Sequence, residues 1–264
     1  MKSDKIIRAF AFFLLPAVMV AGLSGCVPGA GNTQGSSLPL LKKVWRGRYS
    51  AAYAVSSKKG ASSAETLWIS YSPSGRDRVL VTMVLKKGDE TAADVEAYLD
   101  KKTLQPLEVN KSVKRNGNRI EVKTQYLGAR VTVRLVKNKK KKHLTFDSPS
   151  KIYYDNDVIL LVLQALDFNA YLKKQSKEKN EKISVALAHP QMGHVPVAAM
   201  HLKKKKDSVM VSGKAADCYL VELSYGQMMT HRAWYEREMP HRLVKYETKN
   251  EVFELKNLSD GAEK

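Results

Sequence analysis

The stretch at residues 107–126, LEVNKSVKRNGNRIEVKTQY, decides the fold class. Apolar and polar residues alternate on both sides of Asn116-Gly117, and alternation over this length predicts half-buried strands. Asn-Gly between two such runs is a strong hairpin signal, because both residues adopt the positive φ angles of a tight turn. The stretch therefore predicts an antiparallel hairpin made of residues 107–114 and 119–126.

The same alternation extends from this hairpin in both directions along the chain. Further strands are predicted at 45–55, 65–71, 78–86, 94–99, 130–137, 143–146, 183–187, 195–202, 209–211, 216–224, 232–236, 241–247 and 251–256. Short turns separate most of them, as an antiparallel meander requires.

The alternation breaks once, at residues 155–172, DNDVILLVLQALDFNAYL. This run is too long and too continuously apolar for a half-buried strand, and it predicts a buried helix over about residues 157–166. Asp155, Asp157 and Asp167 are interpreted as capping residues. The fold class is mainly β (α+β): a meander curled as an open or partial barrel with one buried apolar helix, the alternative being two packed layers.

Residues 1–25 are predicted to be a secretory signal. Lys2, Lys5 and Arg8 precede a short apolar stretch, and small residues follow it. This order is typical of an export signal, and the apolar stretch is shorter than the ~20 residues that cross a bilayer comfortably.

Leu23-Ser24-Gly25-Cys26 resembles the lipobox of bacterial lipoproteins. The resemblance implies cleavage before Cys26 and a covalent lipid on Cys26, an anchor that several acyl chains make effectively permanent. Because residue 27 is Val rather than Asp, the resemblance further implies the periplasmic face of the outer membrane rather than the inner membrane. An ordinary signal peptide and an uncleaved anchor are the alternatives.

The mature chain is predicted to have three parts. Residues 26–41 carry the lipid and form a flexible tether rich in Gly, Ser and Pro. Residues 42–258 form the β-rich domain, and residues 259–264 form a disordered tail. Cys218 is then the second and last cysteine, so the domain has no internal disulfide, and its alternating surroundings indicate a buried small side chain.

The chain is strongly basic, with a formal net charge of +19. An excess of this size favours a polyanionic partner, and export to the envelope argues against nucleic acid. The basic residues gather in bunches where turns are predicted. Those taken as candidate contacts for anionic groups are Lys139, Lys140, Lys141, Lys142, Lys203, Lys204, Lys205 and Lys206. The alternative is that these lysines only solvate the turns.

Motifs for catalysis or metal binding are absent from the sequence: it has no nucleophile elbow, phosphate loop, dinucleotide fingerprint or cysteine-pair metal site. The histidines do not have the spacing of a zinc pair, so no metal and no cofactor beyond the covalent lipid are expected. The histidines considered are the five after residue 188: His189, His194, His201, His231 and His241. Glu236, Glu238 and Glu247 are interpreted as cross-strand ion pairs with Arg237 and Arg242.

An apolar ligand pocket is the remaining candidate site. It would lie between the long apolar element and aromatic residues of the sheet. Its expected lining is Trp68, Tyr98, Val158, Leu161, Leu163, Leu166 and Trp234.

Three segments resemble the envelope family known as the domain of unknown function numbered 3108. They are residues 98–107, YLDKKTLQPL; residues 158–168; and residues 233–236 with 240–247. The resemblance implies an envelope domain without assigned catalytic residues. The expected architecture is also similar to periplasmic lipoprotein-carrier half-barrels, which is a likeness of fold alone.

These observations predict a lipid-anchored, non-catalytic binding module for a lipid-like or polyanionic envelope ligand. Lipid, lipopolysaccharide or an envelope protein are the partners considered, and the oligomeric state is left open. The alternative is a structural or interaction scaffold of the outer membrane without a small ligand. A hydrolase is a third, weaker alternative, because no motif supports it.

Overall fold

The computed structural model describes residues 38–41, 48–58, 62–115, 117–148, 150–177, 182–189, 197–203, 207–211, 213–225 and 229–261. The predictions outside these ranges include the signal at 1–25, the lipid site Cys26, the tether at 26–37, the lysines 204–206, His194 and the tail at 262–264. In the part of the chain that is described, no helix combines the length and apolar character that crossing a membrane requires.

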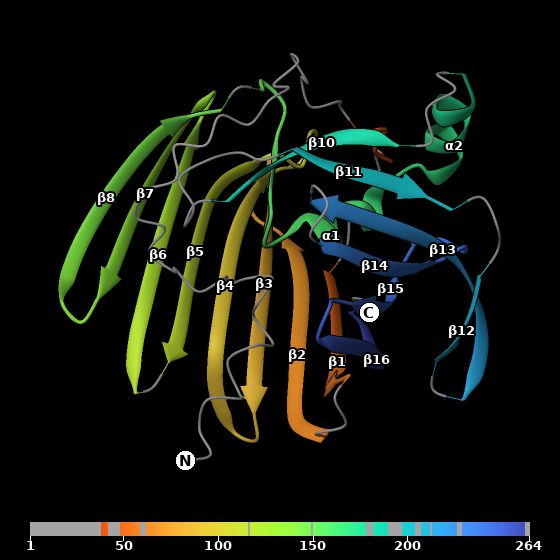
Figure 1. Ribbon diagram of the computed structural model, residues 1–264, viewed down its shortest axis with the longest axis horizontal. Coiled ribbons are helices and arrows are strands. Elements are labelled where there is room, and N and C mark those ends of the chain that lie inside the picture. The colour runs from red at the N-terminus through yellow and green to blue at the C-terminus, as the bar shows by residue number, and fades with distance from the viewer. Residues whose placement is uncertain are drawn as a thin grey trace.

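The domain is mostly β, with one open, curled sheet, as the sequence predicts, and it has two short α-helices where the sequence predicts one (Figure 1). Its elements are β1 (Arg48–Ser57), β2 (Ser62–Pro73), β3 (Arg78–Lys87), β4 (Glu90–Asp100), β5 (Pro106–Arg115), β6 (Asn118–Leu127), β7 (Arg130–Lys137), β8 (Lys140–Asp147), β9 (Tyr154–Asp155), α1 (Ile159–Val162), the 3-10 turn η3 (Leu163–Ala165), α2 (Phe168–Lys177), β10 (Ile183–Ala188), β11 (Val197–Leu202), β12 (Asp207–Val211), β13 (Lys214–Tyr225), β14 (Met229–Glu236), β15 (Leu243–Glu247) and β16 (Glu251–Gly261).

The strands pair in a simple order. It runs β8-β7-β6-β5-β4-β3-β2-β1-β16-β15-β14-β13-β11-β10-β9, and β12 pairs with β13 beside this path. The pairs are antiparallel except for β9 with β10, where Leu187 lies opposite Tyr154. The strands β8 and β9 are adjacent in sequence, yet they form the two ends of the sheet and do not pair, so the curl stays open.

The predicted Asn-Gly hairpin is confirmed. The β5–β6 ladder places Arg115 opposite Asn118, and Gly117 has a φ of 73° in the left-handed region that the turn requires. The β7–β8 hairpin uses Asn138 and Lys139, with φ of 50° and 64°, as its two turn residues. The lysine run therefore lies differently from the prediction: Lys139 is in the turn, whereas residues 140–142 belong to β8.

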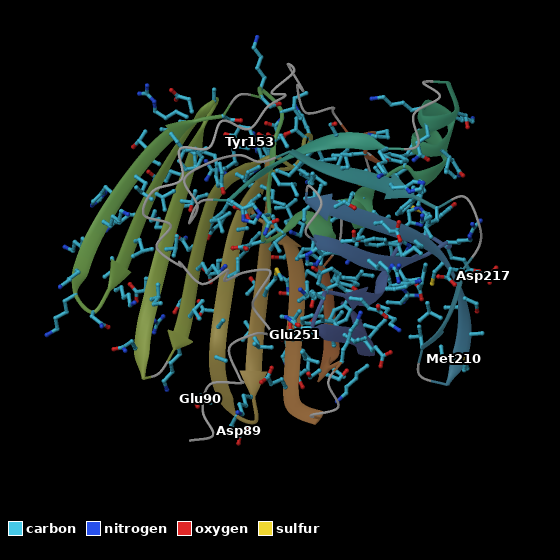
Figure 2. All side chains as sticks on the ribbon, viewed as in Figure 1. Asp89, Glu90, Tyr153, Met210, Asp217 and Glu251 are labelled. Carbon is cyan, nitrogen blue, oxygen red and sulfur yellow. The ribbon has the colours of Figure 1, made fainter. Side chains whose placement is uncertain are left out.

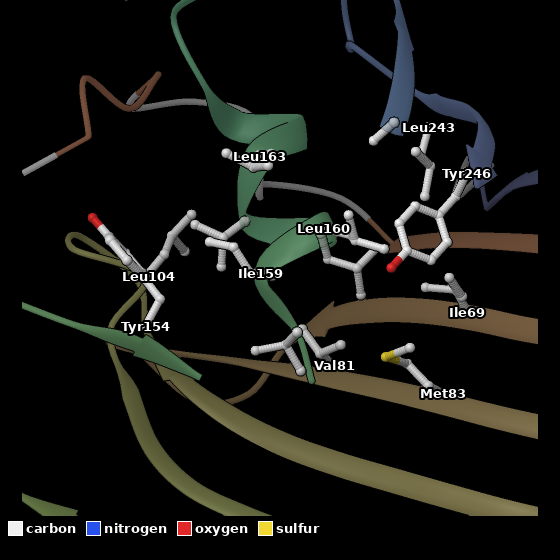
Figure 3. Packing of buried hydrophobic residues seen from close by; sticks show 14 of the residues in the cluster. Ile69, Val81, Met83, Leu104, Tyr154, Ile159, Leu160, Leu163, Leu243 and Tyr246 are labelled. Atoms are coloured by element: carbon white, nitrogen blue, oxygen red, sulfur yellow. The ribbon is translucent and has the colours of Figure 1, made fainter. Parts of the chain in front are cut away.

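The helical segment differs from the prediction of one helix over residues 157–166. It consists of α1 and η3, followed after Leu166 by a separate helix α2. The segment breaks at Leu166 because that residue is extended and forms an antiparallel bridge with Leu40. Both α1 and η3 are wholly buried inside the curl, as expected for the apolar run. In Figure 3, Leu160 lies among Ile69, Met83 and Tyr246 of the sheet.

Both ends of the predicted domain extend further than expected. Leu38 is buried, and Leu40 packs against the core although residues 26–41 are predicted to be a tether. At the other end, β16 continues to Gly261, which lies opposite Arg48, although a disordered tail is predicted from residue 259. Backbone pairing in both places extends the ordered domain beyond the limits that hydropathy alone suggests.

Candidate functional site

The structure does not bring the seven expected pocket residues together. Val158, Leu161, Leu163 and Leu166 are fully buried in the core inside the curl. The three aromatic residues are on the other face of the sheet, because they alternate with the inward-facing positions. Trp68 is 43% exposed between the buried Leu67 and Ile69.

Tyr98 and Trp234 show the same alternation. Tyr98 is half-buried between Ala97 and Leu99, which are both fully buried. The indole N–H of Trp234 donates a hydrogen bond of 2.7 Å to Asp207 of β12, and the Lys245 ammonium lies 5.3 Å from its ring centre. Trp234 is thus covered on the outer face by β12 and does not contact the helical segment as a pocket lining.

A buried polar cluster that the alternation pattern does not predict lies inside the curl. We define it as Lys111 of β5, Tyr126 of β6, and Asp155 and Asp157 before α1. The Lys111 ammonium lies 2.9 Å from the Asp157 carboxylate, and the Tyr126 hydroxyl donates a hydrogen bond to Asp155. The other oxygen of Asp155 accepts the Asp157 backbone N–H at 2.7 Å.

Burial dominates the electrostatics of the polar cluster. Burial, and then the neighbouring Asp157, raise the pKa of Asp155 to about 7. Burial also raises the pKa of Asp157 and lowers the pKa of Lys111, although the two groups attract each other. In each case the loss of hydration outweighs the ion pair. With Lys111 and Asp155 almost fully covered, the cluster suits a structural role and offers little room for a substrate.

Of the three predicted capping residues, only Asp167 caps a helix. Asp155 and Asp157 do not cap α1, whose N-cap is Val158 without a side-chain hydrogen bond. Asp167 does cap a helix: it accepts the Ala170 backbone N–H at 2.9 Å in the first turn of α2. A signal for the cluster was present in the sequence, because Lys111 occupies an inward position between Val109 and Val113. The partners of Lys111 come from a distant segment, which alternation cannot identify.

The exposed lysines concentrate at one end of the sheet. In an antiparallel meander, turns alternate between the two ends, so the β1–β2, β3–β4, β5–β6 and β7–β8 turns share one end, the lower one in Figure 1. We call the exposed lysines at these four turns the basic rim. They are Lys58, Lys86, Lys87, Lys114, Lys137, Lys139 and Lys140.

Two lysines of the basic rim are paired with carboxylates. Lys58 lies 2.8 Å from Glu247, and Lys114 contacts Glu90, which Figure 2 labels at the same end beside Asp89. Among the described residues, the other five have no carboxylate within ion-pair distance. Of the second predicted group, Lys203 is described, and it pairs with Glu222 at 3.0 Å.

The other titratable candidates have structural surroundings. Glu236 pairs with Arg242, and Glu247 pairs with Lys58 and Lys245 rather than with an arginine. Cys218 is buried, and burial raises the pKa of its thiol to about 12.

Two further candidates from the sequence, Arg237 and His241, contact aromatic side chains. The Arg237 guanidinium lies 4.5 Å from the centre of the Tyr219 ring, and the His241 ring packs edge-on against Phe168. Within the described ranges, no three or more His, Cys, Asp or Glu side chains converge as metal ligands would.

The outer face of β4–β7 carries a shallow polar depression of about 320 Å³. Its lining includes acidic side chains on β4 (Asp94, Glu96) and β6 (Glu121), and basic side chains on β6 (Arg119, Lys123) and β7 (Arg134). Lys123 is already paired with Glu108 at 2.9 Å. The depression is open and mixed in charge, so it does not select a ligand class.

Comparison with solved structures finds a similar fold. The crystal structure of a beta-barrel-like protein of domain of unknown function DUF1849 from Brucella abortus matches with a TM-score of 0.50, over 82% of this chain and 99% of that chain. The identity is 8%, so the likeness shows a beta-barrel-like fold alone. No family model and no curated protein matches the chain. The resemblance to the family numbered 3108 stays a prediction.

Proposed function

We propose that this protein is a lipid-anchored envelope protein that binds the phosphates of an anionic lipid surface through its basic rim. The observation that carries the proposal is the common position of four lysine-bearing turns at one end of the sheet. Charges that share one end can meet a flat surface together. Each lysine close to an anionic leaflet contributes about 1 kcal/mol to binding.

A simpler explanation covers only part of the rim. Lysines on an edge strand prevent sheets from pairing edge to edge, which accounts for Lys140 at the start of the edge strand β8. The same reason does not apply to Lys86 and Lys87, since β3 lies between β2 and β4 inside the sheet. Binding to an anionic surface explains both groups.

The anchor predicted at Cys26 is compatible with this orientation. The segment of about 12 residues from Cys26 to Leu38 reaches at most ~40 Å. The ten-residue strand β3 spans ~34 Å, so a tether of this reach allows either end of the sheet to approach the leaflet. The outer membrane is the proposed location, on the grounds of the lipobox resemblance and Val27.

Vesicle binding tests the proposal. The full chain with Cys26→Ser, which cannot be acylated there, is sedimented with vesicles of phosphatidylcholine alone or mixed with phosphatidylglycerol. We expect binding to the anionic vesicles that weakens as salt is added, because salt screens exposed charges. Lys139→Gln/Lys140→Gln should weaken binding about tenfold or more, from the loss of two such contacts.

The matched control is Lys101→Gln/Lys102→Gln, which removes the same charge from the β4–β5 turn at the other end. It should bind nearly as well as the parent chain. Equal loss in both variants would mean that net charge alone drives binding and would overturn the rim. Equal binding to neutral and anionic vesicles would overturn the proposal and favour the scaffold alternative.

A further inference from the structure

Two glutamates are buried inside the curl, and no described lysine, arginine or histidine lies within ion-pair distance of either. Glu65 on β2 is 6% exposed, and Glu251 at the start of β16, labelled in Figure 2, is 7% exposed. Their strands flank β1 on either side, with Val55 opposite Glu65 and Ser57 opposite Glu251. Both glutamates share the inward face with Leu67 and Phe253.

Neither carboxylate has a hydrogen-bond or ion-pair partner among the described residues. One oxygen of Glu251, Oε2, is completely buried and unpartnered. The backbone of Glu251 is fixed, since its N–H donates to the Thr248 hydroxyl at 3.0 Å and its carbonyl accepts the Thr248 N–H at 2.9 Å. The backbone that carries this carboxylate is therefore fixed, and its Oε2 is left without a partner among the described residues.

Two carboxylates in such surroundings need compensation. Burial of an ion without a partner is costly, and a like charge nearby adds to the cost. Burial, and then the charge of Glu65, raise the pKa of Glu251 to about 7. The exposed Lys87 lies opposite Glu65, and its charge lowers the pKa of Glu65. Burial has the larger effect, so the pKa of Glu65 is raised.

We propose that Glu65 and Glu251 together hold a hydrated divalent cation of the Mg²⁺ class. Carboxylate oxygens are the ligands of hard cations, and Mg²⁺ is commonly held by one or two carboxylates while it keeps several waters. Ca²⁺ takes six to eight oxygens, more than this pair supplies. The cation would join β2 to β16 across β1 and satisfy the unpartnered oxygen of Glu251.

The test uses the full chain, freed of metal by a chelator and dialysed, at a pH above 7. Thermal unfolding is followed with added MgCl₂, and with NaCl at the same ionic strength to account for screening. We expect MgCl₂ to raise the Tm beyond the NaCl reference, and isothermal titration calorimetry to show a single site. Glu65→Gln and Glu251→Gln should both abolish the increase.

Both glutamine variants are expected to fold, because each removes a buried charge and should raise the metal-free Tm. Glu254→Gln is the matched control on the exposed face of β16 and should keep the response to Mg²⁺. An increase that survives Glu65→Gln and Glu251→Gln would overturn the site. If MgCl₂ did not raise the Tm of the parent chain, the site would also be overturned. Glu65 and Glu251 would then be assigned a shared proton instead of a cation. No lipid is present, so this result is independent of the basic rim.

Discussion

The ammonium of Lys111 lies 2.9 Å from the carboxylate of Asp157, with 3% and 12% of the two side chains exposed. This contact joins β5 to the turn before α1, across the inside of the curl. The Tyr126 hydroxyl joins β6 to Asp155 in the same way, and the Tyr153 hydroxyl donates to the Gly128 carbonyl. Because β8 and β9 do not pair, side chains provide these connections where a closed barrel would use a backbone ladder.

Removing one member of the Lys111–Asp157 pair should destabilise the fold strongly. Lys111→Met leaves the buried Asp157 without its partner, and the expected loss is about 3–5 kcal/mol in the free energy of unfolding. Lys111→Met/Asp157→Leu should recover most of that loss, because it removes both charges. Urea unfolding measures both variants.

The matched control for this pair lies on the outer face. Lys123 pairs with Glu108 at the same distance, 2.9 Å, but the two side chains are 48% and 27% exposed. Lys123→Met should therefore cost less than about 1 kcal/mol. Similar losses for Lys111→Met and Lys123→Met would contradict the importance of burial.

His231 should make the fold sensitive to acid. Burial lowers its pKa to about 3, and its Nδ1 lies 2.9 Å from the Tyr246 hydroxyl. In the unfolded chain the pKa is ~6.5, so the unfolded state binds more protons between the two values. The stability that neutral His231 provides is complete above pH ~6.5 and declines as the pH falls towards 3.

Urea unfolding at neutral and acidic pH tests this. His231→Phe loses the Tyr246 hydrogen bond at every pH, but its stability should fall less on acidification than that of the parent chain. His143→Phe, on the exposed strand β8, is the control and should keep the parent slope. Glu251 has the opposite effect on stability, because its raised pKa favours the folded state as the pH falls. All three chains contain Glu251, so this effect is the same in each. Parallel slopes for His231→Phe and the parent would disprove the assignment.

Much of the fold could be predicted because the local pattern and the final packing agree. Alternation and the Asn116-Gly117 turn identify the hairpins, and in a meander consecutive strands are also neighbours in the sheet. The same alternation of inward and outward positions places Trp68 and Trp234 on the outer face, because their neighbours along the strand face inward. The pocket prediction was wrong because its residues were chosen for their apolar character, without regard to the face of the sheet on which alternation places each of them.

The rest depends on contacts between distant segments. The helix breaks at Leu166 because Leu40 pairs with it, and no property of the apolar run itself indicates that bridge. In the same way, Lys111 has an inward position that alternation reveals, but its partner Asp157 is 46 residues away. The pairing of β9 with β10 is what brings Asp155 and Asp157 beneath β5 and β6.

The segment before β1 should contribute to stability as part of the domain. Leu38 is 6% exposed, the Leu41 N–H donates to the Ala165 carbonyl at 2.7 Å, and the Asp167 N–H donates to the Pro39 carbonyl at 2.7 Å. Leu38→Ala should cost about 2–3 kcal/mol, as for a buried leucine in a site that relaxes partly. Amide exchange at Asp167 should quicken in this variant, whereas Leu127→Ala, at an exposed leucine of β6, should change neither quantity. Unchanged exchange at Asp167 would mean that the segment does not dock.

One side-chain contact should help to hold the strand β12 in position, besides its pairing with β13. It lies off the main path of the sheet and pairs with β13 alone, while the indole N–H of Trp234 reaches Asp207 at its first residue. A hydrogen bond to a charged group contributes about 1.5–3 kcal/mol, so Asp207→Ala should destabilise by an amount in that range. In a Trp45→Phe/Trp68→Phe background, which leaves Trp234 as the single tryptophan, the emission of Trp234 should also shift to the red as water reaches it. Ser208→Ala changes the neighbouring exposed residue and should leave both readings unchanged. If Asp207→Ala lost stability without the shift, Trp234 would be covered by the sheet itself and not by β12.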